Sequence, residues 1–264
     1  MIIADKKKII FIHIEKTAGT SIAALLLPHI SEAYRSKNAK MPGTARDWRK
    51  GWHINQQHAK FSESLAIIDK LKINPQEYFK FAVVRNPYSW LLSVWDNRYQ
   101  AKLDAKANWK NKLRSKIAKH TGFLPLPAQL FHQMYPDGSF KSFVLFVDYL
   151  LSNYPPSFTK GFLGTSDQYS YIDNDRDIKF DFVAKLENLE EDLAKIKLIV
   201  GLNDNFKPSH LNQKEKTENR EKYLDYYDDK SIAIVNRIFA RDFEIFGYQP
   251  IPNLAEYQKE FVFS

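Results

Sequence analysis

Residues 9–21 have the sequence IIFIHIEKTAGTS, in which an apolar run passes directly into a short loop rich in hydroxyl groups. The apolar run predicts a buried β-strand, and the sequence IAALLL at residues 22–27 predicts a helix. A helix N-terminus presents backbone N–H groups without helical partners and the positive end of a dipole, here beside Lys16. This stretch therefore predicts an anion-binding loop between a strand and a helix.

A second segment, residues 79–93, repeats this order of strand and helix. Its strand ends at Arg85, and Pro87 stands where the first turn of a helix tolerates proline. Strands that alternate with helices are typical of a parallel sheet whose ligands bind at the carboxyl ends of its strands. We therefore expect an α/β fold with three layers, in which helices flank a parallel sheet and two anion sites lie at one edge.

The composition limits the class of protein. The chain has 264 residues, of which 44% are hydrophobic, so we expect a single domain over residues 1–264. It has no cysteine, which excludes disulfides and thiolate metal sites and suits a cytoplasmic protein. Because no apolar stretch approaches the ~20 residues that a membrane span needs, we expect a soluble protein without a span.

The net charge of +8 at pH 7 favours an acidic partner, which could be nucleic acid, a polyanionic sugar, an anionic cofactor or a membrane surface. Much of the excess lies in residues 102–119, where seven Lys and Arg residues face a single Asp. This basic segment fits a solvated surface equally well. Its functional interpretation is a dock for an anionic saccharide, with Trp109 available to stack on a sugar ring or a base.

The first loop does not have the Walker A pattern, in which a lysine follows the second glycine. Here Lys16 precedes Gly19. An ATP-dependent phosphotransferase is therefore a less favoured interpretation.

Residues 13–21, HIEKTAGTS, resemble the phosphosulfate loop of the carbohydrate sulfotransferases, which reads His-Ile-Pro-Lys-Thr-Ala/Gly-Gly-Thr-Ser. Those enzymes have a P-loop-kinase-like fold and use 3′-phosphoadenosine 5′-phosphosulfate (PAPS). Residues 79–87 together with Ser93 are similar to the family's motif for the 3′-phosphate of the cofactor. Segments 180–189 and 241–248 resemble later landmarks, so the resemblance to the uronyl and chondroitin-type enzymes covers most of the chain.

The resemblance implies roles for individual residues. The cofactor's phosphosulfate would be held by the loop residues Lys16, Thr17, Ala18, Gly19, Thr20 and Ser21. Lys16 would also act in catalysis, by neutralising the bridging oxygen of the leaving bisphosphate. The 3′-phosphate would be bound by Arg85 and Ser93, with Arg220 as a further candidate in a covering loop.

His58 resembles the histidine that is the suspected general base in the uronyl enzymes. A sugar hydroxyl is a poor nucleophile until its proton is withdrawn, and histidine suits this task near neutral pH. His53 is the main alternative for the same role. The implied reaction is an in-line transfer of the sulfuryl group that needs no metal.

Two positions depart from the family pattern. Glu15 replaces the usual proline of the first loop and brings a negative charge to an anion site, and Trp90 stands where many relatives carry arginine. The leading interpretation is therefore a cytoplasmic, PAPS-dependent sulfotransferase with a carbohydrate acceptor, for which an anionic saccharide is a candidate, and no nucleic-acid partner. The alternatives are a non-catalytic binder of sulfated glycans, a nucleic-acid-binding protein and, less favoured, the phosphotransferase.

Overall fold

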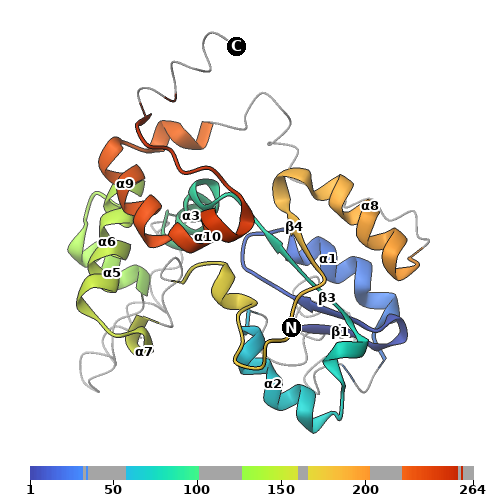
Figure 1. Cartoon of the computed structure of the whole chain (residues 1–264). Helices are drawn as coiled ribbons and strands as arrows, with labels where there is room; N and C mark the ends of the chain where they lie inside the picture. The colour runs from blue at the N-terminus through green and yellow to red at the C-terminus, as the bar shows by residue number, and fades with distance from the viewer. Residues whose placement is uncertain are drawn as a thin grey trace, which may run out of the picture. The chain divides into compact units, whose positions relative to one another are not determined.

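The computed structural model describes residues 1–31, 34, 58–100, 127–159, 166–202, 222–254 and 257 (Figure 1). The chain divides into two compact units. The first comprises residues 1–86 and 168–218, and the second comprises residues 87–167 and 219–264. Such a division does not test the single domain expected from the sequence, which stays a prediction.

The first unit is built on a sheet of four strands in the order β1-β2-β3-β4. The strands are β1 (Ile2–Ala4), β2 (Ile9–Ile12), β3 (Phe79–Val84) and β4 (Phe182–Lys185). Strands β2, β3 and β4 are parallel, whereas β1 pairs with β2 in the antiparallel direction. The α/β fold is confirmed, but the sheet is mixed, because the short turn η1 (Asp5–Lys7) cannot make a parallel crossover.

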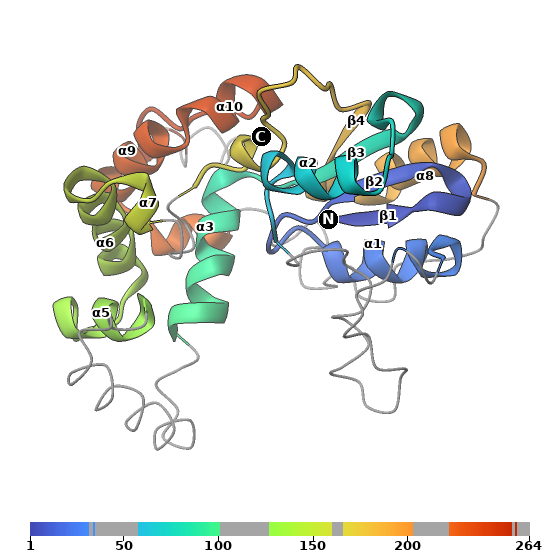
Figure 2. The same ribbon diagram turned by 90° about the horizontal axis from the view of Figure 1, so that it is seen from below.

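Helices flank this sheet in the first unit. They are α1 (Gly19–Leu26), α2 (Phe61–Lys70) and α8 (Leu189–Val200), joined by the short 3-10 turns η2 (Leu27–His29), η5 (Pro75–Glu77), η9 (Tyr169–Tyr171) and η10 (Leu186–Asn188). Apolar residues of α1 and α8 join Phe11, Phe81 and Val83 in one buried cluster, so both helices cover the same face. Figure 2 shows α1 and α2 on opposite sides of the sheet.

The register of the parallel strands brings their carboxyl ends to one edge of the sheet. Ile12 of β2 pairs with Ala82 of β3, and Val84 of β3 pairs with Lys185 of β4. The segments that follow β2, β3 and β4 therefore begin close together. This edge is where ligands bind in parallel sheets.

The described part of the second unit is helical. Its helices are α3 (Pro87–Trp95), α5 (Pro127–Met134), α6 (Phe140–Asn153), α7 (Pro156–Thr159), α9 (Asp229–Ile238) and α10 (Ala240–Phe246), with the π-turn η6 (Asp96–Gln100) and the 3-10 turn η12 (Lys222–Tyr226). Aromatic rings fill the core of this unit. Trp90 is 1% exposed and meets Phe239 edge-on at 5.6 Å, which gives this departure from the family pattern a packing role.

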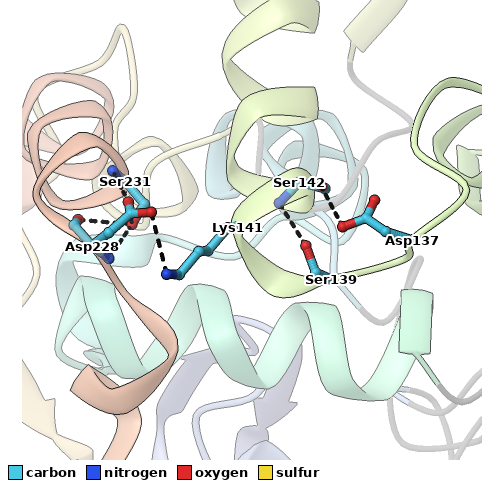
Figure 3. Close-up of polar contacts among 6 residues, drawn as sticks. All are labelled: Asp137, Ser139, Lys141, Ser142, Asp228 and Ser231. Carbon is cyan, nitrogen blue, oxygen red and sulfur yellow. Dashed lines mark hydrogen bonds and ion pairs between the residues drawn. The ribbon is translucent and has the colours of Figure 1, made fainter.

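Side-chain caps fix the starts of α6 and α9 (Figure 3). The hydroxyl oxygen of Ser139 accepts a hydrogen bond from the Ser142 N–H at 3.2 Å. Asp228 and Ser231 form a reciprocal capping box, in which each side chain accepts from the other's backbone N–H at 2.9 and 2.8 Å. The ammonium of Lys141, on α6, lies 3.3 Å from Asp228 and links the two helix starts.

Replacing Asp228 with alanine is expected to lower the free energy of unfolding by about 1–2 kcal/mol at neutral pH. Partial burial raises the pKa of Asp228, but the hydrogen bonds from Ser231 and the charge of Lys141 outweigh it and leave the pKa below its usual value. The carboxylate therefore stabilises the fold above the unfolded-state pKa of about 4, and this contribution is lost as the pH falls through the lower folded-state pKa.

Urea unfolding of the wild type and the D228A variant at neutral and acidic pH measures this effect. The difference in the free energy of unfolding between the wild type and D228A should become smaller at acidic pH. Lys141→Ala is the matched control, because an exposed ion pair contributes only about 0–1 kcal/mol. An equal loss in D228A and K141A would assign the effect to the ion pair instead of the cap.

Candidate functional site

The loop between β2 and α1 has an unusual backbone. Lys16 and Ala18 have φ angles of 64° and 61°, in the left-handed region, whereas Thr17 between them does not. Alternation of this kind forms concave turns of N–H groups that bind anions. The Thr17 hydroxyl donates to the carbonyl of Ile14 at 2.9 Å and is fully buried, so this side chain braces the loop from within.

The first turn of α1 has backbone N–H groups that are available to bind an anion. The N–H groups of Ser21 and Ile22 both donate to the carbonyl of Ala18, at 2.9 and 3.2 Å. Within the described residues, the N–H groups of Gly19 and Thr20 make no backbone hydrogen bond. These two donors, together with the positive end of the helix, fit a phosphate or sulfate group.

Gly19 is needed because the imidazole of His13 lies against it. A Cβ atom built on Gly19 would stand 1.8 Å from Nε2 of His13. His13 is 4% exposed, and its ring stacks on Phe11 at 5.8 Å and meets the His58 ring edge-on at 4.6 Å. His13 therefore packs against the loop and supports it.

His58 lies beside the same loop and contacts it through both ring nitrogens. Nδ1 is 3.1 Å from the carbonyl oxygen of His13, and Nε2 is 3.2 Å from Oε1 of Glu15. The Glu15 side chain is 7% exposed and that of His58 is 23% exposed. The carboxylate that departs from the family pattern is therefore turned inward against the candidate base.

The phenol of Tyr171 lies close enough to Glu15 to feel its charge. Lys60 holds its ammonium 5.9 Å from the centre of the Tyr171 ring. Burial, followed by the negative charges of Glu15 and Glu63, raises the pKa of Tyr171 well above its usual value. Tyr171 is thus a neutral phenol at physiological pH.

Arg85 follows β3 and is 8% exposed. Its backbone N–H donates to Oε1 of Gln168 at 2.8 Å, and its carbonyl accepts from Nε2 of the same side chain at 2.6 Å. Gln168 is fully buried. One side-chain amide therefore fixes both polar groups of the Arg85 backbone.

The next residue is held in a similar way. The N–H of Asn86 donates to Oε1 of Glu187, in the turn after β4, at 2.7 Å. Because the strands are parallel, these contacts lie at the same edge of the sheet as the first loop. The structure thus brings together residues 16–21, His58 and Arg85, adding Gln168 and Glu187.

The family model for the sulfotransferase family matches residues 1–249. The chain belongs to the sulfotransferase family. The carbohydrate sulfotransferase 12 proteins of Mus musculus and Xenopus laevis are similar to it, with 22% and 23% identity. These alignments cover 96% and 94% of this chain but only 61% and 60% of the relatives, so this chain spans about three fifths of their length. No solved structure gives a significant match.

The other predicted site residues of this chain lie in the second unit or outside the described residues. Ser93 lies on α3 in the second unit and is half-buried. Arg220, His53 and the basic segment at 102–119 lie outside the described residues. Their predicted roles stay predictions.

Two features are absent from the described part of this chain. None of its helices is long and apolar enough to span a membrane. In the same residues, no group of three or more His, Asp and Glu side chains is placed to hold a metal ion.

Replacing Gln168 with methionine is expected to reduce the preference for adenosine 3′,5′-bisphosphate over adenosine 5′-phosphate by about tenfold. Methionine fills a similar volume but makes neither hydrogen bond to Arg85. The Arg85 backbone is then held less firmly, and its guanidinium is positioned less precisely. Calorimetric titration with both nucleotides gives the ratio. A variant that is less stable but keeps the wild-type ratio would show that Gln168 supports only the fold.

Proposed function

We propose that this chain transfers a sulfuryl group from PAPS to a hydroxyl of a carbohydrate. One observation carries the proposal. In a chain of the sulfotransferase family, the loop with two left-handed residues lies at the same sheet edge as the buried Arg85. A ligand with anionic groups at two places, such as an adenosine 3′,5′-bisphosphate, fits this pair of sites. The relatives named carbohydrate sulfotransferase 12 support the class of acceptor.

The donor groups present fit the cofactor. Gly19 and Thr20 offer N–H groups, Lys16 offers an ammonium, and Thr20 and Ser21 offer hydroxyls for the phosphosulfate. Arg85 offers a planar guanidinium, which suits a 3′-phosphate better than a point charge does. When bound, PAPS supplies the sulfuryl group and leaves as the bisphosphate.

The chain's own residues have two tasks in this mechanism. Lys16 and the first turn of α1 stabilise the negative charge that grows on the leaving phosphate. His58 takes the proton of the acceptor hydroxyl. Because Nδ1 faces a carbonyl and Nε2 faces Glu15, His58 has to exchange its contact with Glu15 for the hydroxyl before it can accept that proton.

Calorimetric titration with adenosine 3′,5′-bisphosphate, adenosine 5′-phosphate and ATP with magnesium tests the donor site. We expect clear preference for the bisphosphate, and no magnesium requirement. Mass spectrometry of neutral and anionic oligosaccharides incubated with PAPS and protein then tests transfer. Preference for ATP with magnesium would favour the phosphotransferase, and tight bisphosphate binding without transfer to any saccharide would favour a protein that binds without turnover. The cytoplasmic location stays a prediction.

A further inference from the structure

Glu15 occupies an unexpected place for a carboxylate. It belongs to the loop that the proposed function assigns to the phosphosulfate, and its side chain is 7% exposed. A buried negative charge repels an incoming anion more strongly than an exposed one, because water screens it less. A loop with this residue therefore binds an anionic cofactor well only if a nearby positive charge compensates Glu15.

His58 is placed to supply that charge. Its Nδ1 lies 3.1 Å from the carbonyl oxygen of His13, and a carbonyl only accepts hydrogen bonds, so Nδ1 carries a proton. Its Nε2 lies 3.2 Å from Oε1 of Glu15, and two lone pairs would repel each other at this separation. A second proton therefore lies between Nε2 and Oε1, and the two side chains together carry no net charge.

The neighbouring groups are consistent with a Glu15–His58 pair that carries no net charge. The uncharged ring of Tyr171 lies under the ammonium of Lys60, and Glu63 contributes a second negative charge that acts on the phenol. The ring of His13 packs edge-on against His58 at 4.6 Å. Lys16 is in the same loop as Glu15. Loss of the positive charge on His58 would leave this region more negative by one unit.

We propose that Glu15 and His58 form a charge-compensating pair that maintains cofactor affinity, so that His58 supports binding as well as proton transfer. Glu15 is then a positioning residue that holds the His58 ring. When the acceptor arrives, the shared proton passes to Oε1 of Glu15, which leaves Nε2 with a lone pair to take the proton of the hydroxyl. This inference rests on the proposed function, because it assumes that the loop binds an anionic nucleotide. It explains how the loop tolerates glutamate where the family pattern has proline.

A double-mutant cycle tests the pair by titration with adenosine 3′,5′-bisphosphate at low ionic strength. His58→Ala is expected to lower the affinity by at least about tenfold, since it leaves the Glu15 charge without this compensation. Adding Glu15→Gln to His58→Ala is expected to restore most of the lost affinity. The control is Glu77→Gln, which removes an exposed carboxylate near the opposite end of β3 and should leave the affinity unchanged.

Nitrogen NMR of the His58 ring provides a readout that needs no ligand. In the wild type at neutral pH both ring nitrogens should carry a proton, whereas in Glu15→Gln only one should. An unprotonated Nε2 in the wild type, or equal affinities of the H58A variant and the H58A/E15Q variant, would overturn the pair. A wild type that binds no bisphosphate would instead overturn the proposed function, and the NMR measurement would still decide whether the pair exists.

Discussion

Replacement of Arg85 by alanine is expected to remove most of the discrimination between adenosine 3′,5′-bisphosphate and adenosine 5′-phosphate. A guanidinium that binds a dianionic phosphate through charge-assisted hydrogen bonds contributes about 2–4 kcal/mol, which is on the order of 30- to 1,000-fold in affinity. Arg85 is 8% exposed, so its charge is only weakly screened by water. Calorimetric titration of the variant with both nucleotides measures the change.

Lys16→Ala is the matched control for this prediction. Lys16 belongs to the loop assigned to the 5′ phosphate, which both nucleotides share. Its loss should lower the affinity for both nucleotides by a similar factor and leave the ratio of the two affinities unchanged. Arg85→Lys adds a second comparison, because lysine keeps the charge but not the planar fork. If the R85A variant kept the wild-type ratio of affinities for the two nucleotides, another residue would have to bind the 3′-phosphate.

The sheet was largely predictable because its strands are short apolar runs bounded by clear signals. Strand β3 begins at the predicted residue, Phe79, and ends at Val84, directly before Arg85. Helix α8 is followed by Gly201, whose φ of 65° suits glycine. The antiparallel β1 was not predicted. Its three residues are too few to show a period, and only their pairing with β2 reveals them as a strand.

Helix α5 lies within residues 121–138, a segment rich in proline and glycine. Proline and glycine favour irregular structure, but Pro127 stands at the first position of the helix, where proline is tolerated. Ala128 and Phe131 then bury one helical face. The tertiary contacts of Phe131 with Tyr99 and Phe146, at 5.6 and 5.4 Å, outweigh the local signal.

The candidate site was predictable in its motifs but not in its supports. Residues 16–21 and Arg85 could be found because each motif is continuous in the sequence. Gln168 lies 83 residues from Arg85, and Glu187 lies 101 residues from Asn86. A single buried glutamine carries no local pattern, so only the fold reveals its partner. The direction of the Glu15 side chain was open for the same reason.

Replacement of Gly19 by alanine is expected to destabilise the protein by about 3 kcal/mol, near the upper end of what an overpacked core costs. The new Cβ would lie 1.8 Å from Nε2 and 1.9 Å from Cδ2 of His13, far inside contact distance. His13 cannot swing away cheaply, because Phe11 and His58 pack against its ring. The displaced loop should also bind adenosine 3′,5′-bisphosphate more weakly. Urea unfolding and calorimetric titration measure the two effects.

The His13→Ala background separates this clash from other effects of the substitution. With the imidazole removed, the Cβ of residue 19 no longer meets the ring, so Gly19→Ala should cost little stability there. The gain in helix propensity, up to about 1 kcal/mol, then outweighs the remaining strain. Residues in contact give non-additive free energies, and the coupling in this cycle should approach the full cost of the clash. An equal loss in both backgrounds would mean that Gly19 is needed for its backbone freedom, not for the approach of His13.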